Sequence, residues 1–177
     1  MTTFRNIILG AAVALVAVSC GGSATETATA VIESEIADQI GLGDLEATCD
    51  QPDERVVGAE FPCTATTESG DVIRFTTTFE EEDRIFVLPT NVLLASDLPL
   101  LEQEAAEVLG PEVDAVIDPA DIECPDTAVV LDENDQVTCS ITDAASGTTY
   151  ELIATLTDFV RDEGFQNRFY EVGAEIE

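Results

Sequence analysis

Five cysteines are the residues of this chain whose type and spacing point to definite chemistry. Four of them fall into two pairs, with thirteen residues between Cys49 and Cys63 and fourteen between Cys124 and Cys139. In an oxidising compartment such cysteines close disulfide bridges. A zinc site of four cysteines is the alternative, but zinc sites usually bring cysteines in C-x2-C pairs and often use histidine, and the sequence has neither. We therefore expect two bridges and no bound metal or other cofactor.

The fifth cysteine, Cys20, directly follows an apolar run from Ile7 to Val18. As a helix this run would measure roughly 18 Å, whereas a bilayer core is about 30 Å thick. The run therefore has the length of a signal-peptide core, and Arg5 before it and small residues after it complete the pattern of a signal peptide over residues 1–19. The stretch AVSC, which ends at Cys20, resembles the lipobox of bacterial lipoproteins, in which the cysteine sulfur is lipidated and the peptide is cut just before it. An ordinary secretory signal that leaves Cys20 as a free thiol is the alternative.

Carboxylates are the other abundant reactive groups, and the sequence gives them no catalytic arrangement. Histidine is absent, which excludes Ser-His-Asp and Cys-His mechanisms and histidine metal ligands. A hydrolase needs only two carboxylates at a set separation. In a chain with 37 acidic residues, however, two acids that are close in sequence do not indicate a catalytic pair. We expect the acidic run Glu80 to Asp83 to be a solvated hairpin turn and identify no catalytic residue.

One acidic segment, Asp132, Asn134 and Asp135, faintly resembles a calcium loop and supplies the weak metal candidates of the chain. Val137 stands where an EF-hand loop requires glycine, and no glutamate closes the loop. A hairpin turn is therefore the favoured interpretation.

The strongly negative charge of the chain limits the classes of partner that it can bind. The chain has 6 basic and 37 acidic residues and a net charge of -31, with an apolar fraction of 45% that is ordinary for a folded protein. Such a field repels nucleic acids and anionic lipid headgroups, which excludes a nucleic-acid partner and peripheral binding to phospholipid.

Residues 20–30 are predicted to be the lipidated Cys20 followed by a flexible tether, because the residues after Cys20 are small and polar. Beyond this segment the sequence repeats itself. Residues 48–83 and 123–158 each contain one cysteine pair, then a Thr-rich alternating strand, a glycine turn (Gly70 or Gly147) and a second alternating strand. Because each copy has its own two cysteines, pairing within a copy is the economical connectivity, with bridges Cys49–Cys63 and Cys124–Cys139. Each copy is small enough for such a bridge to supply much of its stability.

Each copy is preceded by a helical pattern. Ile32, Ile36 and Ile40 lie on one helical face before Gly41, and a second stripe of Leu101, Ala105, Val108 and Leu109 ends at Gly110-Pro111. The segment from Gly110 to Ile122 is longer than its counterpart in the first copy and predicts a loop insertion. Further strands are expected over residues 55–61, 84–88, 128–131 and 165–172. The sequence thus predicts an α+β protein of two tandem domains, residues 31–92 and 96–177, each with one helix on a three- or four-stranded antiparallel sheet and one disulfide.

The two copies and the segment before them resemble a known protein family. A helix, a cysteine pair and a glycine-turn hairpin behind a lipobox resemble the domain-of-unknown-function family four-three-three-three of actinobacterial envelope lipoproteins. The likeness covers residues 31–88 and 98–172, and the second copy, with Glu123-Cys124-Pro125 and Val137-Thr138-Cys139, is the closer one. The family has no established activity, so the resemblance implies location and fold but no mechanism.

The sequence therefore predicts a non-enzymatic lipoprotein, held by Cys20 on the extracytoplasmic face of the cell membrane, that presents a surface to an envelope protein. A lipoprotein that binds a small ligand or a divalent cation is the main alternative, and a two-carboxylate hydrolase is the third hypothesis.

Overall fold

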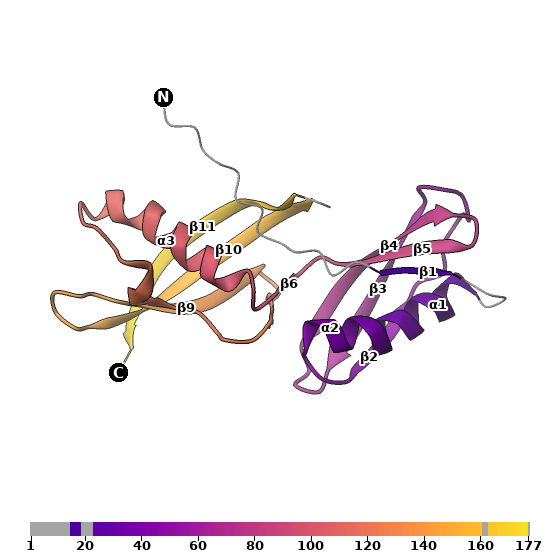
Figure 1. The fold of residues 1–177 in the computed structure, drawn as a ribbon, viewed down its shortest axis with the longest axis horizontal. Helices are drawn as coiled ribbons and strands as arrows, with labels where there is room; N and C mark the ends of the chain where they lie inside the picture. The colour runs from indigo at the N-terminus through magenta and orange to yellow at the C-terminus, as the bar shows by residue number, and fades with distance from the viewer. Residues whose placement is uncertain (1–14, 19–22, 161–162, 177) are drawn as a thin grey trace, which may run out of the picture. The chain divides into compact units, whose positions relative to one another are not determined.

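The computed structural model describes residues 15–18, 23–160 and 163–176 (Figure 1). The chain divides into two compact units with the boundary between Val92 and Leu93, and each unit is described by itself. No helix in the described part of the chain is long and apolar enough to cross a membrane.

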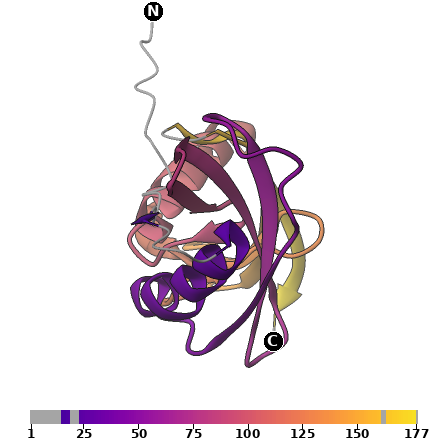
Figure 2. The same ribbon diagram turned by 90° about the vertical axis from the view of Figure 1, so that its right-hand side faces the viewer.

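The N-terminal unit is one helical rod on an antiparallel sheet. The rod consists of α1 (Ala24–Val31), a π-helical turn η1 (Ile32–Ile36) and α2 (Ala37–Ile40). The strands are β1 (Leu15–Val18), β2 (Leu45–Cys49), β3 (Glu60–Thr67), β4 (Val72–Glu81) and β5 (Arg84–Pro89), in the order β1-β5-β4-β3-β2. Figure 2 shows the rod on one face of this sheet. Ile32, Ile36 and Ile40 are buried as their spacing predicts, and Gly41 ends the rod at φ 69°.

The C-terminal unit has the same succession of elements. Its helix is α3 (Leu98–Glu112), followed by a 3-10 turn η2 (Pro119–Asp121). Its antiparallel sheet contains β7 (Ile122–Glu123), β9 (Gln136–Thr142), β10 (Thr149–Val160) and β11 (Gly164–Ile176), in the order β11-β10-β9-β7. The core joins α3 to the sheet through buried residues such as Leu101, Leu109, Leu152 and Leu156. The α+β fold with a helix on an antiparallel sheet in each half is thus confirmed.

Both disulfides are present and join the same places in the two units. Cys49 lies directly opposite Cys63 in the pairing of β2 with β3, and their sulfurs are 2.02 Å apart. Cys124 follows β7 and bonds to Cys139 of β9, with sulfurs 1.96 Å apart. In each unit the bridge therefore fastens the edge strand beside the helix to the rest of the sheet.

The start of the N-terminal unit differs from the sequence prediction of a tether over residues 20–30. Helix α1 already begins at Ala24, because Ser23 and Glu26 form a capping box: the Glu26 amide donates to Ser23 Oγ (3.2 Å), and the Ser23 amide donates to Glu26 Oε2 (2.9 Å). Ala24, Ala28 and Val31 are buried. These small residues pack in the unit instead of forming a flexible spacer.

The first sheet also has one strand more than expected. β1 pairs antiparallel with β5 from Leu15 opposite Val87 to Val18 opposite Arg84. This strand lies inside the segment predicted as a signal peptide, so it belongs to the chain before any cleavage at residue 19.

Smaller differences concern individual strands. β3 begins at Glu60 and no strand covers residues 51–59, where Val57 is 69% exposed and Gly58 adopts φ 84°. The expected strand at residues 128–131 is reduced to β8 (Val129–Val130), which pairs with β6 (Val92–Leu93) outside the main sheet. Helix α3 continues through Gly110-Pro111 to Glu112, and Val108, expected in the apolar stripe, is 42% exposed.

Candidate functional site

The segment that distinguishes the two units connects the helix to the first strand of the sheet. In the N-terminal unit only residues 41–44 join α2 to β2, whereas residues 113–121 join α3 to β7. We call residues 113–117 the valine loop, because it contains Val113 and Val116. Since insertions on a common scaffold often carry function, this loop is the place to look for a site.

Contacts with the end of α3 hold the valine loop in place. The Ala115 amide donates to the Gly110 carbonyl at 3.0 Å. A Cβ atom at Gly110 would stand 2.9 Å from the Ala115 carbonyl oxygen, so the loop approaches the helix only because residue 110 has no side chain. Asp114 turns the chain with φ 53°. The loop is therefore a folded element that lies against the helix.

The side chains of the loop are unusually apolar for their exposure. Val116 is 100% exposed and Val113 is 59% exposed. Single exposed apolar residues are ordinary, but neighbouring ones around a hollow mark a binding surface. Val113 and Val116 are neighbouring exposed residues of this kind, and both line a hollow.

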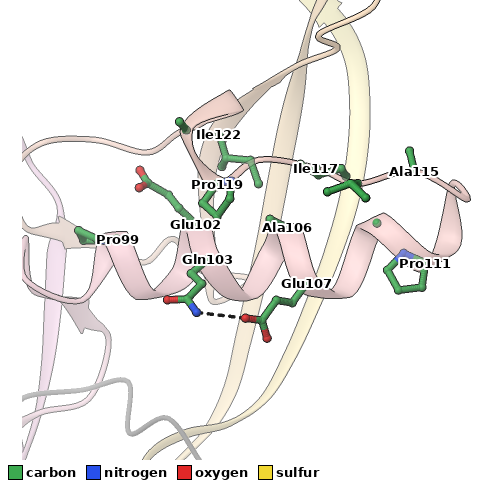
Figure 3. Close-up of a pocket in the computed structure, with 13 residues that line it drawn as sticks. Pro99, Glu102, Gln103, Ala106, Glu107, Pro111, Ala115, Ile117, Pro119 and Ile122 are labelled. Atoms are coloured by element: carbon green, nitrogen blue, oxygen red, sulfur yellow. Dashed lines mark hydrogen bonds between the residues drawn. The ribbon is translucent and has the colours of Figure 1, made fainter.

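Two hollows flank the loop. The first, of about 660 Å³, lies between α3 and the loop (Figure 3). On its α3 wall, Gln103 Nε2 donates to Glu107 Oε1 at 3.1 Å. Glu102, also on this wall, accepts a hydrogen bond from the Cys124 amide at 3.0 Å.

The second hollow, of about 520 Å³, lies between the loop and the sheet, and we call it the sheet-side hollow. Its walls are mainly apolar and include Leu109, Val113, Val116, Ile117, Ile141 and Val172. Its volume falls in the range of small-molecule sites, about 300 to 1,000 Å³. The loop thus separates an open, partly polar hollow from a more apolar one.

The charges around the sheet-side hollow are of one sign. Among the residues that the structure describes, its lining contains Asp121 and Asp143 and no arginine or lysine. Hydrogen bonds from the Ser146 hydroxyl (2.6 Å) and the Ala145 amide (3.0 Å) hold the pKa of Asp143 below its ordinary value. Asp143 is therefore ionised at neutral pH, and the mainly apolar lining of the hollow includes negative charge.

The weak metal candidates lie in a turn between β8 and β9, which belong to different sheets, so this turn does not close the expected hairpin. Asp132 Oδ1 accepts hydrogen bonds from the amides of Asn134 (2.8 Å) and Gln136 (2.9 Å), and Asp135 adopts φ 59°. The Gln136 hydrogen bond is the main cause that lowers the pKa of Asp132. In the described part of the chain, no three His, Cys, Asp or Glu side chains are placed to hold a metal ion.

Apart from Cys20, the other candidate residues named from the sequence lie in a hairpin of the N-terminal sheet and in the two disulfides. Glu80 and Glu81 lie at the β4–β5 hairpin, where Arg84 pairs with them at 3.9 and 2.7 Å. The four paired cysteines are in the disulfides. Cys20, the predicted lipidation site, lies outside the described residues.

Sequence reasoning missed a polar cluster beneath α3. Arg168 of β11 donates from Nη1 to Glu104 Oε1 of α3 at 3.0 Å and from Nη2 to the Phe165 carbonyl at 2.8 Å. Tyr170 lies nearby, and burial, together with the Glu104 carboxylate, raises its pKa well above 10. The only sequence signal is an arginine in an alternating strand of a chain with few basic residues.

Comparisons of the chain with protein-family models, with curated proteins and with solved structures found no match. The arrangement of the site itself therefore carries the functional argument.

Proposed function

We propose that this chain is an exported protein of the cell envelope, lipid-anchored through Cys20, that works by binding another envelope component and not by catalysis. As part of this proposal we place it with the envelope lipoprotein domains of unknown function that its repeats resemble. The exposure of Val116 in the valine loop carries the proposal, because this apolar side chain is 100% exposed.

Two features support export and anchoring. A disulfide in each unit suits an oxidising compartment outside the cytoplasm. The lipobox-like stretch before Cys20 would give the mature protein acyl chains at its first residue.

The early start of α1 changes the geometry of this anchor. Only Gly21 and Gly22 separate Cys20 from Ser23, so the link spans at most about 10 Å. This length is close to the Debye length of about 8 Å at physiological ionic strength. The N-terminal unit would therefore be held beside the membrane.

The membrane fraction of cells tests the anchor. The Cys20→Ala variant is expected in the medium or the soluble envelope fraction, whereas the unchanged chain sediments with membranes. Continued sedimentation of the variant would contradict lipid anchoring.

A photoreactive amino acid tests the binding surface. Placed at Val116 in intact cells, it should crosslink a discrete envelope component, whereas the same group at Val57, which is also exposed but lies in the N-terminal unit, should not. Equal crosslinking at both positions, or none at Val116, would contradict the assignment of the valine loop as the binding surface.

A further inference from the structure

The sheet-side hollow combines a cavity with apolar surface that the fold leaves uncovered. Val113, Val116 and Val172 all line it, and they are 59%, 100% and 44% exposed. Since exposed apolar surface is stabilised by contact with another apolar surface, an apolar group that entered the hollow would contact all three.

The charge of the hollow restricts what the apolar group can carry. Asp121 and the ionised Asp143 belong to the lining, which has no basic residue within the described part of the chain, and the chain as a whole has a charge of -31. A carboxylate or phosphate on the ligand would be repelled, whereas a cation would be attracted.

Tyr150 adds a second feature that favours a cation. Tyr150 belongs to the lining together with Asp121 and Asp143, and aromatic faces attract ammonium groups when these lie within about 6 Å of the ring centre. Apolar walls, two acids and an aromatic ring form a mixed lining that suits an amphipathic ammonium compound.

We propose that the sheet-side hollow binds a small amphipathic amine, whose aliphatic or aromatic body lies against Val113, Val116 and Val172 and whose ammonium group lies near Asp121 and Asp143. This site goes beyond the proposed partner-binding role and does not require it, because binding can be measured without a membrane or a partner protein.

Three probes with the same alkyl chain test the proposal: octylammonium, 1-octanol and octanoate. Each is titrated into the full chain carrying Cys20→Ala, and binding is followed by the NMR shifts of valine and isoleucine methyl groups. Octylammonium should shift the methyl groups of the hollow and bind about fivefold or more tightly than 1-octanol, which corresponds to about 1 kcal/mol of charge interaction. Octanoate should bind more weakly than 1-octanol.

Two substitutions separate the apolar and charged contributions. Asp121→Asn should weaken octylammonium binding several-fold and leave 1-octanol binding unchanged. Val172→Thr, which keeps the side-chain shape at an exposed position, should weaken both, whereas Val57→Thr in the N-terminal unit should weaken neither.

The proposal is overturned if octanoate binds as tightly as octylammonium, if the methyl groups of the hollow do not shift, or if Val57→Thr acts like Val172→Thr. These results would leave the proposed partner surface untouched, since that surface is tested separately by crosslinking at Val116.

Discussion

Arg168 of β11 and Glu104 of α3 form an ion pair that ties the helix to the last strand of the C-terminal sheet. Nη1 and Oε1 are 3.0 Å apart, and only 16% and 20% of the two side chains are exposed. The residues are 64 positions apart in the chain. The pair therefore links the beginning and the end of the unit.

Removing one partner of this pair should destabilise the C-terminal unit. Arg168→Ala leaves the Glu104 carboxylate partly buried without its cation, and loss of about 2 to 3 kcal/mol is expected after allowance for the remaining solvent exposure. Calorimetric unfolding measures it. Arg84→Ala is the control, because its pairs are more exposed, and it should cost less than about 1 kcal/mol. Equal effects of the two substitutions would contradict a structural role for the buried pair.

Tyr170 should remain protonated to unusually high pH in the folded protein. Burial, and then the Glu104 carboxylate, raise its pKa above the ordinary value of about 10. Folding thus favours the neutral phenol, so this contribution to stability is complete below about pH 10 and is lost as the pH rises further. In a Tyr150→Phe variant, the ultraviolet absorbance of phenolate should appear well above pH 10 in the folded state and near pH 10 in urea. Appearance near pH 10 in both would refute the prediction.

Each disulfide should stabilise its own unit. The loops closed by the two bridges have similar lengths, and loss of either bridge is expected to cost its unit about 2 to 5 kcal/mol. Both tyrosines, Tyr150 and Tyr170, lie in the C-terminal unit, so tyrosine fluorescence in urea reports on that unit alone. Replacing Cys124 and Cys139 by alanine should lower the urea midpoint, whereas replacing Cys49 and Cys63 should leave it unchanged. A lower midpoint after replacement of Cys49 and Cys63, or an unchanged midpoint after replacement of Cys124 and Cys139, would contradict independent stabilisation of the units.

Cleavage of the proposed signal peptide should open one edge of the N-terminal sheet. β1 pairs with β5 before cleavage, and the mature chain would lack β1. Amide hydrogens in β5 should therefore exchange faster in a chain that begins at residue 20 than in the uncleaved chain, whereas those of β3, in the sheet interior, should keep their rates. Equal protection of β5 in both chains would show that β1 does not cover this edge.

The α+β elements and the disulfides were predictable because local patterns determine them. The isoleucine spacing of the first helix, the alternating strands and the two cysteine pairs all depend on residues near in sequence, and the structure confirms each. The start of α1 was missed because residues 21–30 are small and polar, yet the Ser23–Glu26 spacing of a capping box marks it.

The site was less predictable, because it depends on tertiary structure. The sequence shows an insertion between Gly110 and Ile122. It does not show that Ala115 folds against Gly110. Nor does it show that Val172, far along the chain, lines the same hollow as Val113. The Arg168–Glu104 pair likewise requires knowledge of how α3 lies on the sheet.

The position of the valine loop should depend on the missing side chain at residue 110. Alanine there would gain helix propensity of up to about 1 kcal/mol, but its Cβ would stand 2.9 Å from the Ala115 carbonyl oxygen, a backbone atom that moves only with the loop. We expect the steric cost, about 1 to 3 kcal/mol, to exceed the gain and to displace residues 113–117. Amide chemical shifts and hydrogen exchange of the loop measure this displacement.

Gly173→Ala is the matched control for Gly110→Ala. Its Cβ would stand 2.8 Å from Glu151 Oε2, which ends a flexible side chain that can turn aside, and 3.3 Å from Glu151 Cβ, a tight contact that requires a small shift of residue 151. This variant should therefore keep the shifts and exchange rates of residues 113–117. A stabilised Gly110→Ala protein with an unchanged loop would show that helix propensity outweighs the contact, and that the close approach of Ala115 to α3 does not hold the valine loop beside its two hollows.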